Sequence, residues 1–299
     1  MRIVDVPGSL DDRTIDQFAA SVGAWPPDDR LLVDARATQF ASPAGFTALL
    51  TLGQAVAEAA GPRPLLHLPT SDNVSSYWAK AGLLEHAADY FELHGKVPRR
   101  RRAEDSDVLL PVRPVREQLD VHAIIDGIND KITQMLTEQL HHEASFIGGF
   151  SQSLSEVCQN VVEHAGTGGW VAAHTYLFRQ RLGRNVAVIS VSDAGIGFRR
   201  SFEGLHARQL GDRWTDGAAI EAALIHGQSR FRDPGRGQGL MAVKRFVSKW
   251  NSKVSVRSGT ARVAIGPRNW DDEDPRTDDL AWFPGSQLTI VIPAKAGGS

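Results

Sequence analysis

The feature that most constrains the fold is a break in composition at residues 95–114, GKVPRRRRAEDSDVLLPVRP. This stretch combines a glycine and three prolines with four consecutive arginines and an acidic patch. Such a segment buries little apolar surface, so it predicts a linker between two folded units. We place the units at residues 1–95 and 114–299 and the linker at 96–113. A chain of 299 residues is long enough for two cores.

Composition excludes several classes of protein. The formal net charge of -2 at pH 7 provides no field that would attract nucleic acid or an anionic membrane. The single cysteine, Cys158, excludes an internal disulfide framework and suits a reducing compartment. The first residues lack the pattern of a secretory signal, and no apolar run approaches the roughly 20 residues that span a bilayer. We therefore expect a cytoplasmic protein.

The pattern of apolar residues in the first unit alternates between strands and helices. It predicts strands at 31–33 and 65–68, and helices at 44–60 and 74–84. Alternation of this kind within fewer than 100 residues is typical of a small α/β domain.

The second unit has a different order of elements. Helices are predicted at 119–140, 144–165 and 240–250, and strands at 170–178, 186–192, 253–258, 261–265 and 287–292. Two helices followed by a sheet, a long irregular segment and more sheet indicate an α/β sandwich. The expected fold class is thus α/β in two domains.

Glu156 and Asn160 lie four residues apart on the helix predicted at 144–165. Residues at this spacing share one face of a helix. A carboxylate there can activate a water molecule, and an amide oxygen one turn away can ligate a hard cation such as Mg²⁺. An ordinary solvated face is the alternative that this helix alone leaves open.

Asp193 closes an apolar strand and is followed by Gly195 and Gly197 in the sequence DAGIG. A carboxylate at a strand end can accept a hydrogen bond from an exocyclic amine, such as that of adenine. The glycines allow a flat ring or a phosphate chain to approach the backbone. An ordinary strand-to-loop turn is the alternative.

A third segment, GRGQGL, contains Gly235, Gly237, Gly239 and Leu240 and opens a predicted helix. Backbone N–H groups at a helix N-terminus bind anions, and glycine permits close approach. The spacing differs from the Rossmann fingerprint, and the sequence holds no P-loop motif. By itself the repeat is weak evidence for a phosphate site.

The order of the three segments resembles the ATPase domain shared by gyrase, Hsp90, sensor histidine kinases and MutL, the GHKL superfamily with its Bergerat fold. The resemblance covers about residues 115–295 and implies that ATP and Mg²⁺ are the cofactors. It implies that Asn160 ligates Mg²⁺, that Glu156 is the general base, and that Asp193 recognises the adenine amino group.

The same resemblance implies roles for the remaining positions. Gly195 and Gly197 would line the base and ribose, and Ser286 would supply the hydroxyl that the closing strand of the family usually carries. Residues 198–234 would form the lid. The positions flanking the triphosphate would be Gly235, Gly237, Gly239 and Leu240.

Within the superfamily, the chain is most similar to the anti-sigma-factor serine kinases. The run Glu-x-x-x-Asn-x-x-x-His is present at Glu156, Asn160 and His164. The segment between Pro114 and Asn160 is too short for the dimerising phosphoacceptor hairpin of sensor kinases together with the first ATPase helices.

The first unit resembles the STAS domain of anti-sigma-factor antagonists, on the strand ending in Val33 and Asp34 and the sequence FASPAGF that follows at 40–46. With Gly45 on the motif glycine, Ala44 occupies the place of the phosphorylatable hydroxyl. We therefore expect a STAS-like fold without the usual phosphoacceptor, and interpret Ser42 as a helix N-cap or turn residue.

Together these resemblances predict a signalling regulator that switches protein partners with its nucleotide state. The expected partner is a sigma-factor regulator or a STAS-type protein, and any phosphorylation target lies in another chain. An ATP hydrolase that acts as a mechanical switch and an inert nucleotide-binding interaction module are the alternatives. The oligomeric state, including a homodimer, stays open. The acidic segment at 270–282 is expected to be a solvated loop.

Overall fold

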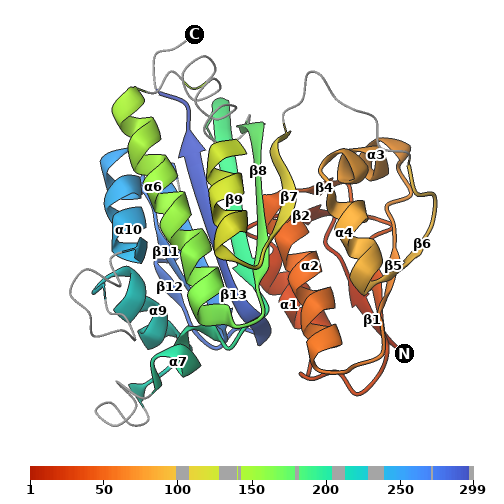
Figure 1. Ribbon diagram of the computed structural model, residues 1–299. Helices are drawn as coiled ribbons and strands as arrows, with labels where there is room; N and C mark the ends of the chain where they lie inside the picture. Colours follow the sequence, from red (N-terminus) through yellow and green to blue (C-terminus); the bar gives the residue numbers. More distant parts are fainter. Residues whose placement is uncertain are drawn as a thin grey trace.

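The computed structural model describes residues 1–98, 108–127, 140, 143–178, 182–203, 213–227, 239–270 and 272–295. Over these residues the chain forms two α/β parts, each with its own principal sheet (Figure 1). The expected fold class is confirmed.

The principal sheet of the N-terminal part is parallel, with strand order β1-β3-β5-β6. Its strands are β1 (Arg2–Asp5), β3 (Leu31–Asp34), β5 (Leu65–His67) and β6 (Glu92–His94), and a short pair joins β2 (Ser9–Leu10) to β4 (Phe40–Ala41). The helices are α1 (Ile15–Val22), α2 (Pro43–Glu58), α3 (Asp72–Lys80) and α4 (Leu83–Tyr90). Parallel neighbours require crossover connections, and here helices provide them.

The helix predicted at 74–84 is in fact two helices. Gly82 separates α3 from α4 and has a φ of 80°. Glycine adopts this left-handed conformation without the steric cost that a Cβ atom adds, so the chain turns here. The predicted strands at 31–33 and 65–68 are confirmed as β3 and β5.

The sheet of the C-terminal part is antiparallel, in the order β12-β11-β10-β13-β9-β8-β7. Its strands are β7 (Val108–Val115), β8 (Gly169–Phe178), β9 (Arg184–Asp193), β10 (Lys253–Gly259), β11 (Ala261–Ile265), β12 (Arg276–Thr277) and β13 (Phe283–Pro293). The helices are α6 (Ala144–Asn160), its π-helical continuation η1 (Val161–Ala165), α7 (Gly197–Ser201), α9 (Asp216–Leu224) and α10 (Gly239–Lys249). Of the helix predicted at 119–140, the described residues up to 127 are helical and 128–139 lie outside the described residues.

The edge strand β7 corrects the expected linker, because residues 108–113 belong to the C-terminal sheet. Leu110 and Val112 of this strand are buried. The sequence did not predict the strand because its prolines are typical of a linker. Proline is tolerated here because an edge strand has one side without ladder hydrogen bonds. Among the residues that the structure describes, β7 pairs only with β8, through an irregular register.

Helix α2 lies between the two sheets. Every residue from 43 to 56 is buried, and a helix buried all round must be covered on all sides. One side of α2 packs in the N-terminal core, and the other lies on β8, β9 and β13, across the sheet from α6 and α10 (Figure 1). Trp170, Ala172 and Phe283 of the C-terminal part join the same core as Phe46. The two parts therefore share a hydrophobic core.

The acidic segment at 270–282 is solvated in part, as expected from its composition, because Asp272, Asp274, Asp278 and Asp279 are exposed. The expectation of a loop throughout is wrong, since two of its residues form β12. Arg276 lies in β12 and donates to Glu221 of α9 at 2.6 Å. The side chain of Glu273 is only 7% exposed and forms ion pairs with Lys253 and Arg262. Carboxylates in this segment therefore pair with specific cations of the sheet and hold it in place.

Candidate functional site

Helix α6 presents Glu156 and Asn160 beside its buried stripe. The stripe expected from the sequence is confirmed, because Phe150, Leu154 and Val157 are all buried. Glu156 and Asn160 are half-buried, one turn apart. A polar pair at the margin of a core keeps access to a ligand while its helix stays anchored.

Asn160 is the last α-helical residue, and the chain continues directly as the π-helix η1. A π-helical turn inside an α-helix often marks a functional site. Gly166, with a φ of 73°, ends the helix as the sequence predicted. The side chain of His164 lies outside the described residues.

Asp193 is the last residue of β9, and the pleat of the strand decides which way it points. Side chains alternate between the two faces of a strand. Ser190 and Ser192 face α2, since their hydroxyls bond to side chains of that helix. Ile189 and Val191 pack in the core that contains α6. Asp193 therefore lies on the α6 side of the sheet, as do Glu156 and Asn160.

The Asp193 carboxylate is buried, with 9% of the residue exposed. Its Oδ1 accepts a hydrogen bond from the N–H of Gly195 at 2.8 Å. Burial raises the pKa of Asp193 to about 7, although the backbone N–H groups of Gly195 and Ser286 act against this rise. A buried carboxylate of this kind gains from any further donor that a ligand brings to it.

The glycines around Asp193 bring several chain segments together. Gly197 has a φ of 74° and begins α7, and Gly285 has a φ of 66°. A Cβ atom on Gly285 would lie 1.8 Å from the Asp193 carbonyl oxygen. Ser286 is the register partner of Asp193 between β13 and β9. The structure thus brings Asp193, Gly195, Gly197 and Ser286 close together.

Ser258 is a residue at this site that the sequence analysis missed. Its hydroxyl accepts a hydrogen bond from the N–H of Phe198 at 3.2 Å and donates to the carbonyl oxygen of Gly285 at 3.1 Å. It also lies 3.3 Å from the hydroxyl of Ser286. Ser258 therefore ties the start of α7 to β13. No motif in the sequence surrounds it, so only the folded structure reveals it.

The glycine-rich segment is described only at its end. Gly235 and Gly237 lie outside the described residues, and Gly239 is the first residue of α10. Leu240 is buried in the same core as the α6 residues. The ring centroids of Phe146 on α6 and Phe246 on α10 lie 4.9 Å apart. Helix α10 therefore packs beside α6.

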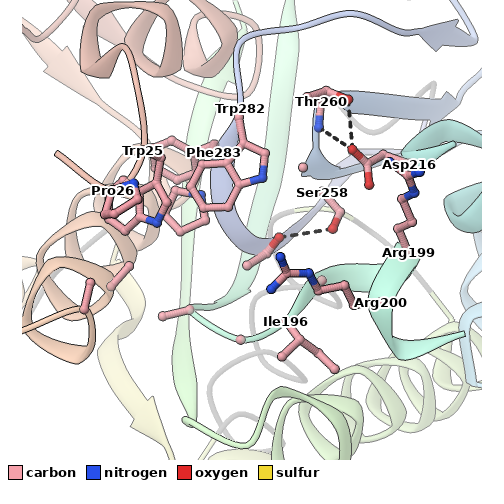
Figure 2. Close-up of a pocket in the computed structure, with 18 of the residues that line it drawn as sticks. Trp25, Pro26, Ile196, Arg199, Arg200, Asp216, Ser258, Thr260, Trp282 and Phe283 are labelled. Atoms are coloured by element: carbon pink, nitrogen blue, oxygen red, sulfur yellow. Dashed lines mark hydrogen bonds between the residues drawn. The ribbon is translucent and has the colours of Figure 1, made fainter. Parts of the chain in front are cut away.

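A cavity of about 850 Å³ lies between the two parts, against the loop that follows Asp193 (Figure 2). Residues 194–197 form one wall. Trp25 and Trp282, whose ring centroids are 5.2 Å apart, lie on one side of it, and Arg199 lies across from them. Glu156, Asn160 and Asp193 are not among the lining residues of this cavity. The loop therefore has a second face, which is turned toward the N-terminal part.

Comparison with known proteins identifies the class to which this geometry belongs. Residues 148–295 match the family described as histidine kinase-, DNA gyrase B-, and HSP90-like ATPase. The C-terminal part therefore contains a domain of this ATPase family. Among solved structures, the chain is similar to the mycobacterial sensor histidine kinase MprB at 17% identity and a TM-score of 0.29, over 62% of this chain and 98% of that chain. No curated protein matches the sequence.

In the part of the chain that the structure describes, none of the helices combines the length and the hydropathy that a membrane crossing requires.

Proposed function

We propose that the C-terminal part binds ATP with Mg²⁺ and acts as a serine-kinase-like regulator whose protein partners change with its nucleotide state. The observation that carries this proposal is the position of Asp193. It is a buried carboxylate at the end of β9, on the α6 side of the sheet, inside the segment that matches the ATPase family.

The residues around Asp193 fit an adenine nucleotide. The carboxylate would accept a hydrogen bond from the adenine amino group, which would supply the donor that its burial favours. The backbone at Gly195 and Gly197 would line the base and ribose, and Ser286 lies beside the carboxylate in the neighbouring strand. Gly239 and Leu240 begin α10, and in this proposal the start of that helix would face the phosphates.

The polar pair on α6, Glu156 and Asn160, would act on the phosphates of the bound nucleotide. The amide oxygen of Asn160 would ligate Mg²⁺, and Glu156 would act as general base toward the attacking hydroxyl or water. Within the described residues, no group of three or more His, Cys, Asp or Glu side chains could hold a metal ion by itself. In this proposal the cation is therefore shared between Asn160 and the phosphate oxygens of the nucleotide.

Calorimetric titration with ATP·Mg²⁺ tests the nucleotide site. Asp193→Asn should weaken binding roughly 10- to 100-fold, because a hydrogen bond to a charged group contributes about 1.5–3 kcal/mol. Asp279→Asn is the matched control: Asp279 is exposed and has a φ of 58°, a conformation that asparagine adopts readily. Equal affinities of wild type and Asp193→Asn would remove the adenine assignment.

The fate of the γ-phosphate separates three activities. With γ-labelled ATP, label on an added protein supports the kinase, free phosphate alone supports the hydrolase, and neither product with binding intact supports an inert binding module. Glu156→Gln should slow either reaction about 100-fold or more, as removal of a general base does. The exposed Glu117→Gln is the control variant with the same chemical change.

Two residues of the N-terminal part support the proposal that the phosphorylation target lies in another chain. Ala44 carries no hydroxyl, and Ser42 is only 3% exposed at the start of α2, between the two sheets. A kinase could not reach Ser42 without separating α2 from its surroundings. The proposed partner is therefore a separate STAS-type protein or sigma-factor regulator, and label transfer to such a protein but not to this chain is the expected outcome.

A further inference from the structure

Helix α2 makes buried hydrogen bonds to the residues that precede Asp193. The Thr51 and Ser192 hydroxyl oxygens are 2.8 Å apart, and those of Thr47 and Ser190 are 2.9 Å apart. The Ser192 hydroxyl also donates to the Thr47 carbonyl oxygen at 3.3 Å. All four of these side chains are 0% or 1% exposed. Ser192 is the immediate neighbour of Asp193, on the opposite face of the same strand.

The same helix bonds to the strand that carries Ser286. The amide Nε2 of Gln287 donates to the Ala44 carbonyl oxygen at 2.6 Å and to the Thr47 hydroxyl at 3.3 Å. Gln287 follows Ser286 in β13 and points to the α2 side. Here too, the residue bonded to α2 is one position away from a residue of the proposed nucleotide site.

A third contact reaches the turn after the Asn160 helix. The Nε2 of Gln54 on α2 donates to the Thr167 carbonyl oxygen at 2.8 Å, and its Oε1 accepts from the indole N–H of Trp170 at 2.8 Å. Thr167 lies in the turn between η1 and β8. One side chain of α2 therefore contacts both the turn that follows η1 and the start of β8.

We propose that α2 of the N-terminal part is the positioning helix of the nucleotide site. Apolar packing alone would hold a helix against a sheet without defining its register, whereas paired buried hydroxyls and amides accept one arrangement. A strand residue held on one face restricts its neighbour on the other face, since both share the same backbone. The N-terminal part thereby sets the geometry of Asp193, Ser286 and the end of the Asn160 helix, and any movement of α2 changes nucleotide affinity.

This inference rests on the proposed nucleotide site, and the experiment reads the two separately. The test variant is Thr47→Val with Thr51→Val, which keeps side-chain shape and removes both hydroxyls. Thr47→Ser with Thr51→Ser restores the hydroxyls and is the rescue. Thr38→Val is the matched control, because Thr38 is 2% exposed and its hydroxyl donates to Pro7 at 3.2 Å within the N-terminal part.

Two measurements are made on each full-length variant: amide hydrogen exchange of the segment 193–197 without nucleotide, and calorimetric affinity for ATP·Mg²⁺. In the valine pair we expect exchange about tenfold faster and ATP binding about tenfold weaker, within the usual range for coupled sites. The serine pair and Thr38→Val should match wild type in both. If the valine pair does not fold, Thr51→Val alone keeps the Thr47 bonds and takes its place.

The outcomes are distinguishable. Exchange and affinity in the valine pair equal to those of Thr38→Val would overturn the positioning role. Faster exchange at 193–197 in a protein that binds no ATP even as wild type would support the positioning of the loop and overturn the nucleotide site. Weaker ATP binding that the serine pair restores supports both. If the serine pair does not restore ATP binding, the loss is due to packing, and the hydrogen-bond mechanism is overturned.

Discussion

The guanidinium Nε of Arg257 donates a hydrogen bond to Oδ1 of Asp16 at 2.8 Å, which joins β10 of the ATPase-family domain to α1 of the N-terminal part. The other carboxylate oxygen of Asp16 lies 3.3 Å from Arg262. Nearby, Lys253 pairs with Asp12 at 3.2 Å, and its side chain is 1% exposed. The contact between the two parts is therefore ionic at this edge, whereas at α2 it combines apolar packing with buried hydrogen bonds. Separating the two parts would expose both charge and core.

Asp16→Ala should destabilise the protein by about 3 kcal/mol, because it leaves the buried guanidinium of Arg257 without its carboxylate. Urea denaturation monitored by tryptophan fluorescence measures the change. Asp72→Ala is the comparison, since its ion pair with Lys96 is exposed on both sides and should contribute little. Equal losses in the two variants would contradict the buried ion pair.

The pH dependence of stability should carry the signature of Asp193. Burial raises the pKa of this carboxyl from 3.8 to about 7, so the folded protein keeps a proton that the unfolded chain has already lost. The stability from this group is fully present below about pH 4 and is lost as pH rises through about 7. Without nucleotide, wild type should lose roughly 2–3 kcal/mol relative to Asp193→Asn between about pH 5 and pH 8. Parallel pH–stability curves for the two proteins would exclude the raised pKa.

Gly285→Ala should be strongly destabilising. The left-handed backbone costs about 1–2 kcal/mol for an L-residue, and the new Cβ would overlap the Asp193 carbonyl oxygen, so a total of about 3 kcal/mol or more is expected. Gly148→Ala on α6 is the control, because its Cβ would meet no heavy atom within 4 Å. That variant should be neutral or stabilised by up to about 1 kcal/mol. Thermal denaturation of both variants measures the contrast.

The thiol of Cys158 should be inert in the folded protein. It is buried on α6, and burial raises its pKa to about 12, so almost no reactive thiolate forms at pH 8. A thiol reagent such as 5,5′-dithiobis(2-nitrobenzoate) should label one thiol in guanidinium and none without it. Native labelling at the rate of a free thiol would contradict the packing of α6. The count is unambiguous because the chain contains 1 cysteine.

The elements best predicted from sequence are those with local signals. The apolar stripe of α6 and the strand ending at Asp193 follow from residue periodicity, and both are confirmed. The break at Gly82 was missed because an isolated glycine in a helical pattern is ambiguous. β7 was missed because its prolines and its neighbouring arginines indicate a linker, and only pairing with β8 reveals a strand.

The residues of the candidate site likewise divide into those with a local sequence signal and those without one. DAGIG at 193–197 is contiguous, so the sequence displays it. Ser258, Gln54 and Thr51 contact the segments around Asp193 and Asn160 through hydrogen bonds to residues far away in the chain. The bond from Gln287 to Ala44 spans 243 positions, and no motif in either segment signals it.

By itself the sequence determined the α/β class, the order of the ATPase-family motifs and the absence of a hydroxyl at Ala44, because each is a local property of residue type and spacing. The tertiary structure decided that α2 lies on the back of the C-terminal sheet and that Asp193 and Ser192 face opposite ways from one strand end. The physical reason is that an apolar face must be buried but does not specify its partner. The partner is selected by the fit of distant surfaces and by the pairing of buried hydroxyls and charges, which exist only once the chain has folded.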